Sequence, residues 1–287
     1  MKVAVIGATG QLGRDLCDIF KSYEVLPLTQ KDIEITDASR VEEVFKNIKP
    51  HILINTAAYH DVEKCEENPD IAFWVNSTAV KKLALICKNS SIRFIHISTD
   101  YVFDGKKNNF YLESDSPNPV NIYGASKYVG EIFIRNICDK YYIFRIASLF
   151  GKFPPEGKEQ NFIEKIITKA KNKEDIRVIN DIMMSPTYAR DAGLKFKEVI
   201  ERDLPSGIYH VTNSGSCSWF EFAEEIVKLL NLKVKIKPLT SERVKRKAQI
   251  PLFSALKSEK LAQFGIKSLR DWKESLKEYL SEKGHLK

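Results

Sequence analysis

This sequence has few cysteines and no long apolar runs, so little in it would cross-link the chain or anchor it in a membrane. Its 287 residues hold five scattered cysteines, an odd number with no Cys-x-x-Cys pair. That pattern argues against a disulfide framework or a zinc site and predicts buried free thiols in a reducing compartment. No apolar run approaches the roughly 20 residues that a membrane span requires, so no membrane partner is expected. From Met1 the chain enters a strand pattern without a charged leader, and we expect a cytoplasmic protein.

Nucleic acid is not an expected partner either, although the formal net charge is +7. The basic excess falls late, at Lys233, Lys235, Lys237, Arg243, Lys245, Arg246 and Lys247. No aromatic residues interleave this run and no helix-turn-helix pattern accompanies it. Two interpretations stay open: a solvated basic face, which is the default, and a cationic rim that attracts a diphosphate-bearing small molecule.

The sequence does contain a regular alternation of strand and helix patterns. Apolar runs predict strands at 2–8, 24–28, 51–58, 93–99, 141–147, 176–179 and 207–212. Amphipathic segments predict helices at 14–20, 38–49, 70–89, 123–137, 162–171, 218–230 and 269–280, with one more ending near residue 202. This alternation is typical of an α/β fold with a doubly wound parallel sheet, Rossmann-like in type.

Length and composition leave room for a second, smaller lobe. A hydrophobic content of 43% is enough for a full core. We place a dinucleotide-binding domain at residues 1–150 and a smaller C-terminal substrate-binding lobe at 151–287, with interleaved segments that return to the first domain. A polar loop at 152–160 is expected to open the second part.

The first expected strand ends in a turn suited to a dinucleotide. Gly7, Gly10 and Gly13 are spaced as Gly-x-x-Gly-x-x-Gly, and a helical pattern follows directly. Glycine lets the backbone approach a pyrophosphate, and a helix N-terminus offers free N–H groups and the positive end of its dipole. The alternative is a glycine-rich turn without a ligand, but the strand before it and the helix after it favour binding.

The second expected strand ends at a tip that bears on the choice between NADPH and NADH. NAD-binding sheets place a carboxylate there for the ribose 2′-hydroxyl. Here the tip reads Thr29-Gln30-Lys31, and Lys31 is suited to a 2′-phosphate. We therefore predict NADPH, while Asp32 and Glu34 nearby leave NADH open. These charges also fit a solvated loop.

The third and fourth strands should end on the same rim as the glycine turn, since ligands of such sheets bind beyond the carboxyl ends of the strands. The small residues that end the third strand would let a cofactor pass close. The cofactor-binding residues predicted there are Thr56, Ala57, Ala58 and Tyr59. Thr99 ends the fourth strand and belongs to the same rim.

Tyr123 and Lys127 are four residues apart in an expected helix, so their side chains share one face. A lysine ammonium beside a phenol favours the phenolate and lowers the pKa of the phenol. Such a phenol is a suitable general acid for a carbonyl near neutral pH. The same spacing occurs on ordinary amphipathic helices, and it gains weight here from Thr99 and the glycine turn.

Together these motifs resemble the extended short-chain dehydrogenase/reductase superfamily, and within it the dTDP-4-dehydrorhamnose reductase family. The resemblance rests on Ser-Thr-Asp-Tyr-Val-Phe-Asp-Gly at 98–105, Asn-Thr-Ala-Ala-Tyr at 55–59, Tyr-Gly-Ala-Ser-Lys at 123–127 and Ser-Pro-Thr-Tyr at 185–188. It covers nearly the whole chain. It implies reduction of the C4 ketone of a dTDP-linked 6-deoxyhexose, dTDP-4-dehydro-L-rhamnose, to dTDP-L-rhamnose.

The resemblance also implies a role for each matching residue. Tyr123 would give a proton to the carbonyl oxygen, Lys127 would bind the nicotinamide ribose and lower the pKa of Tyr123, and Thr99 would hydrogen-bond the carbonyl oxygen. The implied contacts are Gly7, Gly10, Gln11, Leu12 and Gly13 with the pyrophosphate, Glu34 and Ile35 with the adenosine end, and Val62, Thr99 and Tyr101 with the sugar.

Three positions depart from the family's pattern. Ser148 stands where members often have a tryptophan that touches the substrate, and Ile250 stands in place of an arginine. Both changes bear on which sugar is bound. Arg190 matches a glutamate that helps bind magnesium at the dimer interface of some members, which argues against a metal here. A homodimer is left open.

Two other functions are compatible with these motifs. The regulatory subunit of methionine adenosyltransferase shares the fold and much of the pattern, so a non-catalytic NADP-binding subunit is one alternative. A sugar-nucleotide epimerase is another. A dehydratase is disfavoured because Asp100-Tyr101 follows Thr99, where dehydratases place Asp-Glu.

Overall fold

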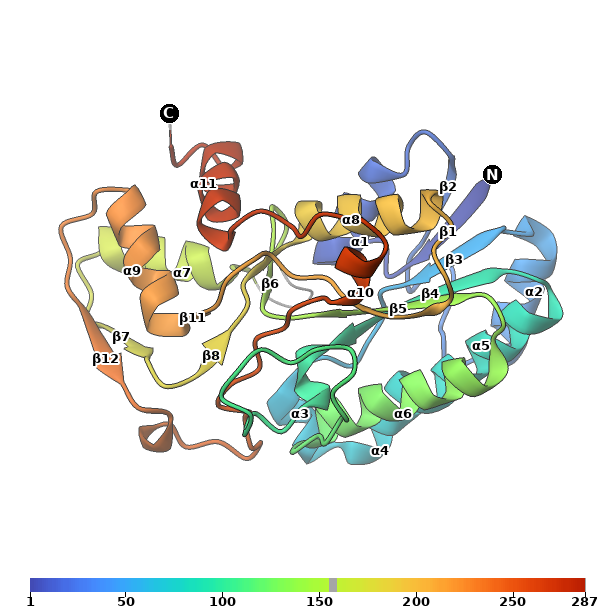
Figure 1. Ribbon diagram of the computed structural model, residues 1–287, viewed down its shortest axis with the longest axis horizontal. Coiled ribbons are helices and arrows are strands. Elements are labelled where there is room, and N and C mark those ends of the chain that lie inside the picture. Colours follow the sequence, from blue (N-terminus) through green and yellow to red (C-terminus); the bar gives the residue numbers. More distant parts are fainter. Residues whose placement is uncertain (155–158, 287) are drawn as a thin grey trace.

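The computed structural model describes residues 1–154 and 159–286. Its centre is a six-stranded sheet in the order β10-β5-β4-β3-β1-β2, and every neighbouring pair is parallel (Figure 1). This confirms the predicted doubly wound sheet. The strands are β1 (Lys2–Ile6), β2 (Glu24–Leu28), β3 (Ile52–Asn55), β4 (Arg93–Thr99), β5 (Tyr141–Ile146) and β10 (Gly207–His210).

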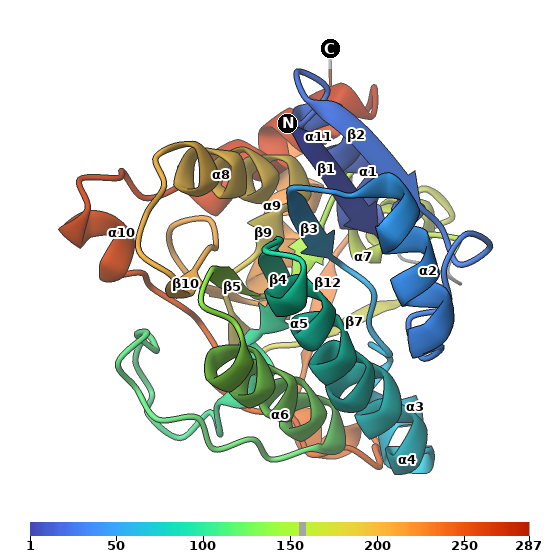
Figure 2. The same cartoon turned by 90° about the vertical axis from the view of Figure 1, so that its right-hand side faces the viewer.

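Helices cover both faces of the sheet because successive side chains of a strand point to opposite sides (Figure 2). In β1, Val3 and Val5 belong to one apolar cluster, and Ala4 and Ile6 belong to the other. The first cluster packs under α1 (Gln11–Ile19) and α8 (Ala189–Glu201). The second packs under α2 (Ala38–Ile48), α5 (Ala79–Asn89) and α6 (Ile122–Ile137).

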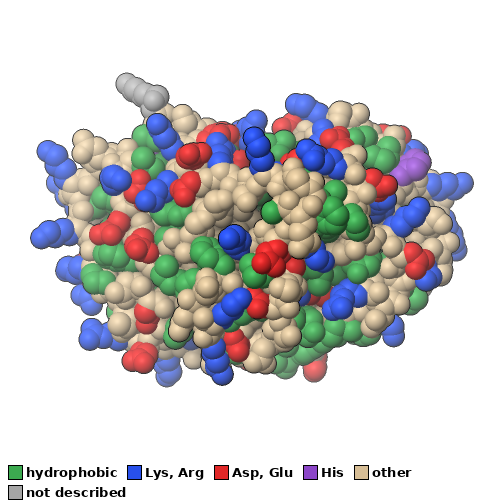
Figure 3. Space-filling model, viewed as in Figure 1, with side chains coloured by type: hydrophobic (Ala, Val, Ile, Leu, Met, Phe, Trp, Pro, Cys, Tyr) green, Lys and Arg blue, Asp and Glu red, His purple; other side chains and the backbone are tan. Residues whose placement is uncertain are grey.

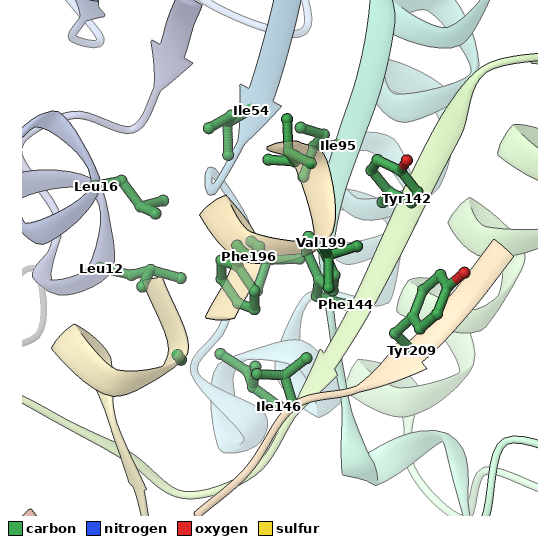
Figure 4. Close-up of a cluster of buried hydrophobic side chains, with 14 of the residues drawn as sticks. Leu12, Leu16, Ile54, Ile95, Tyr142, Phe144, Ile146, Phe196, Val199 and Tyr209 are labelled. Carbon is green, nitrogen blue, oxygen red and sulfur yellow. The ribbon is translucent and has the colours of Figure 1, made fainter. Parts of the chain in front are cut away.

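The cluster under α1 and α8 ties the second half of the chain to the first (Figure 4). Phe196 of α8 stacks on Phe144 of β5 with ring centroids 4.2 Å apart. Leu12 and Leu16 of α1 reach the same core. Helix α8 packs on the central sheet and strand β10 pairs with β5, so both belong to the core of the sheet unit.

Most of the remaining C-terminal elements form a lobe with a core of its own (Figure 1). Its helices are α7 (Phe162–Lys171), α9 (Trp219–Leu229) and α11 (Trp272–Glu282). Its strands are β7 (Ile176–Ile179), β8 (Met183–Met184), β11 (Cys217–Ser218) and β12 (Ile236–Leu239), where β7 pairs with β12 and β8 with β11. A capping box at Ser218 and Glu221 opens α9.

The segment predicted as a helix at 70–89 is helical throughout, but it is not one uniform α-helix. It is divided into α4 (Pro69–Phe73), a π-helical turn η1 (Trp74–Thr78) and α5. Asn76 in the wide turn bonds through its amide with the backbone N–H and carbonyl of Tyr59, both at 2.9 Å, and with Ser126 at 3.0 Å. The turn thus anchors the loop after β3 to α6.

Several short elements were not predicted, because two to six residues carry too little periodicity to be seen in a sequence. Besides β8, β11 and β12 of the lobe, they are α3 (Val62–Glu67), the 3₁₀ turns η2 (Asp100–Val102) and η3 (Ser241–Arg243), β6 (Leu149–Phe150), β9 (Thr187–Tyr188) and α10 (Lys260–Gln263). The last helix begins three residues later than expected, at Trp272, and α1 begins three residues earlier, at Gln11. All five cysteines are free thiols, four of them buried. The predicted loop at 152–160 lies partly outside the described residues.

Candidate active site

A cleft of about 520 Å³ opens beyond the carboxyl ends of β1, β3 and β4. Most of the residues that sequence reasoning selected line it. They are Gly7, Gly10, Gln11, Leu12, Gly13, Thr29, Glu34, Ile35, Thr56, Ala57, Ala58, Tyr59, Thr99, Tyr123 and Lys127. The structure therefore brings the expected cofactor contacts and the expected catalytic residues together at one rim.

The glycine turn is packed so closely that side chains would not fit. Gly7 has φ of +78°, and a Cβ on it would lie 2.5 Å from Thr56 Oγ1. A Cβ on Gly13 would lie 2.1 Å from the carbonyl oxygen of Gly7. The turn closes through a hydrogen bond from Gly10 N–H to that carbonyl at 3.0 Å, and α1 starts at the next residue. A glycine turn without side chains, followed directly by a helix N-terminus, is the arrangement that binds a dinucleotide pyrophosphate.

At the tip of β2 the nearest carboxylate is already engaged. Asp32 Oδ2 accepts hydrogen bonds from the N–H of Thr29 at 2.8 Å and from its hydroxyl at 2.7 Å. These bonds lower the pKa of Asp32 and hold its charge against the loop. Glu34 accepts from Gln30 and Thr36 in the same way. Lys31 is exposed beside them and does not line the cleft.

Thr99, Tyr123 and Lys127 meet at the inner end of the cleft, from the end of β4 and the first turns of α6. Asn121 caps α6 by accepting from Gly124 N–H at 2.8 Å. Lys127 is 2% exposed, and its Nζ donates to the carbonyl of Ile97 at 2.7 Å.

The electrostatics of Tyr123 differ from the expectation. Burial raises the pKa of the phenol, a hydrogen bond with Thr99 partly lowers it, and the Asp100 carboxylate raises it further. Lys127 does not lower the pKa of the phenol as predicted. Burial also lowers the pKa of Lys127, to about 8. Both groups are thus pushed toward their neutral forms.

Asp100 is a cleft residue that the sequence analysis missed. It is 3% exposed, and burial raises the pKa of its carboxyl to about 6, although hydrogen bonds from the hydroxyls of Ser254 and Thr99 lower it. Its Oδ1 accepts from the Thr99 hydroxyl at 3.0 Å. The available signal was its place directly after Thr99 at the end of a buried strand.

Two predicted substrate residues lie beside the cleft and do not line it. The Tyr101 ring meets the Tyr123 ring edge-on, with centroids 5.9 Å apart. Val62 begins α3. Ser148 does line the cleft and adopts φ of +42°, which places its backbone in the left-handed region.

Comparison with known proteins decides the family. The profile described as RmlD substrate binding domain matches residues 1–284. The chain belongs to this family. The spore coat polysaccharide biosynthesis protein SpsK of Bacillus subtilis is 38% identical over 284 residues, which cover 98% of each chain. A dTDP-4-dehydrorhamnose reductase of Aggregatibacter actinomycetemcomitans is 33% identical over 291 residues, covering 96% of this chain and 97% of that protein.

A solved structure of this kind matches over the same span. It is a dTDP-4-dehydrorhamnose reductase of Bacillus anthracis in complex with NADP, with a TM-score of 0.93 and 37% identity, covering 98% of this chain and 99% of that one. The predicted resemblance to this reductase family is confirmed.

In this RmlD-family chain, the basic residues between Lys233 and Lys247 differ in their surroundings. Lys237 pairs with Asp175 at 2.8 Å, and Lys247 pairs with Glu67 of α3 at 2.6 Å. These two lysines fit the interpretation of a solvated face. Arg246 lies close enough to Tyr101 for its charge to oppose the burial that raises the pKa of that phenol. On the face in Figure 3, basic and acidic side chains alternate without one continuous patch.

Two cations and two carboxylates gather around Arg190. Arg190 Nη1 lies 3.5 Å from Glu282 Oε1, and Lys152 Nζ lies 3.9 Å from the same oxygen. Asp15 is nearby, and its pKa rises to about 6 through burial and the Glu282 charge. A guanidinium is not a metal ligand, so this set does not fit a divalent ion. Within residues 1–154 and 159–286, no three metal-ligating side chains gather elsewhere.

The same described residues contain no helix that is both long and apolar enough to cross a bilayer.

Proposed function

We propose that this protein is an NADP(H)-dependent oxidoreductase that reduces the C4 ketone of a dTDP-linked 6-deoxyhexose, with dTDP-4-dehydro-L-rhamnose as substrate and dTDP-L-rhamnose as product. One observation carries the proposal: Thr99, Tyr123 and Lys127 line the same cleft as the glycine turn. The relatives named dTDP-4-dehydrorhamnose reductase and the solved complex with NADP support it.

The cofactor side of the cleft suits NADP(H). Gly7, Gly10 and Gly13 would hold the pyrophosphate against the start of α1, and the adenosine end would lie along Glu34 and Ile35. When bound, the nicotinamide supplies a hydride to the carbonyl carbon. The Asp32 carboxylate is already engaged by Thr29 and is less available to a ribose 2′-hydroxyl, while Lys31 is the nearby cation that a 2′-phosphate would need.

On the substrate side, Tyr123 is the general acid. Burial raises its pKa and so keeps the phenol protonated. The proton would pass to the carbonyl oxygen as negative charge develops there. Thr99 offers a second hydrogen bond to that oxygen. Val62 and Tyr101 would contact the hexose at the mouth of the cleft, and Ser148 leaves room where related enzymes have a tryptophan.

Turnover of NADPH tests the proposal. Tyr123→Phe should lower reduction at least ~100-fold, the scale of a lost general acid, while NADPH affinity measured by fluorescence stays near that of the wild type. Parallel assays with dTDP-4-dehydro-L-rhamnose and its 4-keto-6-deoxy-D-glucose counterpart identify the sugar. Absence of turnover with both, despite tight NADPH binding, would instead favour a non-catalytic regulatory subunit.

A further inference from the structure

A chain of hydrogen-bonded groups ends on Lys127, and two of its side chains, Asn55 and His96, do not line the cleft. Asn55 Oδ1 accepts from Ala57 N–H at 3.1 Å. Asn55 Nδ2 lies 3.2 Å from His96 Nδ1, and His96 Nε2 lies 3.1 Å from Lys127 Nζ. Asn55 and His96 are completely buried, so water does not replace any of these partners.

The direction of the chain is set at the Asn55 end. A backbone N–H only donates, so the amide of Asn55 turns its oxygen to Ala57 and its NH₂ group to His96. His96 Nδ1 therefore accepts, and a neutral imidazole that accepts at Nδ1 carries its proton on Nε2. Burial lowers the pKa of His96 well below its ordinary value, with Lys127 adding to the effect, and this keeps the ring neutral.

The Nε2–H of His96 then points at Lys127 Nζ. A neutral amine accepts that bond through its lone pair and still donates to the carbonyl of Ile97, whereas an ammonium has three donors and no acceptor. If Lys127 is charged, His96 must move its proton to Nδ1, where it faces the NH₂ group of Asn55. The charged form thus leaves two donors face to face inside the protein.

We propose that Asn55 and His96 are positioning residues that penalise the ammonium form of Lys127 and bring its proton exchange into the working pH range. The consequence for catalysis rests on the proposed function, because a charged Lys127 favours the Tyr123 phenolate that forms after proton donation. The chain thereby makes the charge next to Tyr123 depend on pH.

The other charges packed around Lys127 leave this penalty in place. Glu131, one turn further along α6, is bound by Arg145 of β5 at 2.6 and 2.9 Å, and both side chains are buried. Glu131 still raises the pKa of Lys127, but burial outweighs it and the pKa falls to about 8. Tyr123 on α6 keeps its proton, and burial raises the pKa of Asp100 on η2 to about 6.

The titration of the Lys127 amine can be measured by nuclear magnetic resonance of protein with isotope-labelled lysine. The variant Lys127→Met assigns its signal. We expect Lys127 to titrate near pH 8 in the wild type. In His96→Gln the amide oxygen can face Nζ, so the titration should move up by about one pH unit, the size of one buried hydrogen bond. Asn55→Asp should move it further, because it reverses the chain and adds a charge.

Ser77→Ala is the matched control. It removes a buried hydrogen bond to the Ser126 carbonyl of α6, 2.7 Å long, without touching the chain, and should leave the titration of Lys127 unchanged. In parallel, the high-pH limb of kcat/KM should move with the His96→Gln signal, which a purely structural role would not cause.

Two results would overturn the inference: a wild-type Lys127 that titrates in the ordinary lysine range, or a folded His96→Gln protein that titrates where the wild type does. The titration of Lys127 in the wild type tests the inference even if His96→Gln does not fold. A protein that reduces no keto sugar, yet has Lys127 titrating near pH 8 and shifted by His96→Gln, refutes the proposed function and supports the role of Asn55 and His96.

Discussion

Gly13→Ala is expected to destabilise the protein although alanine is the better helix former. Gly13 is the third residue of α1, where intrinsic propensity favours alanine by about 1 kcal/mol. The new Cβ would lie 2.1 Å from the carbonyl oxygen of Gly7 and 2.9 Å from Cα of Ala8. Both are backbone atoms of the turn, so α1 has to retreat by roughly 0.9 Å to reach the shortest tolerated contact of 3.0 Å.

The cost of the contact should exceed the gain in propensity. Overpacking costs about 1–3 kcal/mol, and the upper part of that range applies here because both neighbours are backbone atoms. After the gain of about 1 kcal/mol in propensity, we expect a net loss of up to about 2 kcal/mol in the free energy of unfolding. A shift of nearly 1 Å also displaces the N–H groups that would hold the pyrophosphate, and NADPH affinity should fall at least ~10-fold. Urea unfolding followed by circular dichroism and NADPH titration by fluorescence measure the two effects.

Gly193→Ala provides the matched control, also inside a helix. Its Cβ would meet Cδ1 of Ile19 at 2.5 Å, the far end of a flexible side chain that can rotate away. Stability should therefore stay within about 0.5 kcal/mol of the wild type. If Gly13→Ala unfolds at the same urea concentration as Gly193→Ala and binds NADPH normally, the reasoning is refuted: the close contact with the glycine turn does not require glycine at position 13.

Three further predictions concern charge. Lys31→Ala should weaken NADPH binding more than NADH binding in calorimetry, and an equal loss for both would remove Lys31 from the 2′-phosphate. Arg246→Glu should raise KM for the sugar nucleotide at low salt and less at high salt, whereas Lys233→Glu, with the same change in charge, should not; unchanged kinetics in both would favour a solvated basic face. The pKa of Asp15 is raised from 3.8 to about 6, so the native state holds this proton more tightly and stability should fall as pH rises between those values. Urea midpoints across that range should fall less in Asp15→Asn, and an identical slope would contradict the role of this carboxyl.

Local patterns in the sequence were sufficient for the sheet and for most of the cleft. Strand runs alternating with helical runs permit few topologies other than a doubly wound parallel sheet, and the glycine spacing marks where its ligand sits. The spacing of Tyr123 and Lys127 placed both on one face of α6, as observed. These features depend on residues that are neighbours in sequence, so a linear reading reaches them.

Tertiary structure decided what depends on contacts between distant segments. The interruption at Asn76 arises from bonds to Tyr59 and Ser126, which lie 17 and 50 residues away. The proton balance of Lys127 likewise depends on His96, 31 residues earlier, and on burial that no local pattern measures. The lysine four residues after Tyr123 predicted a lowered pKa for the phenol. Desolvation instead penalises the charged forms of both Tyr123 and Lys127. Only the packed structure shows how deeply each group is buried.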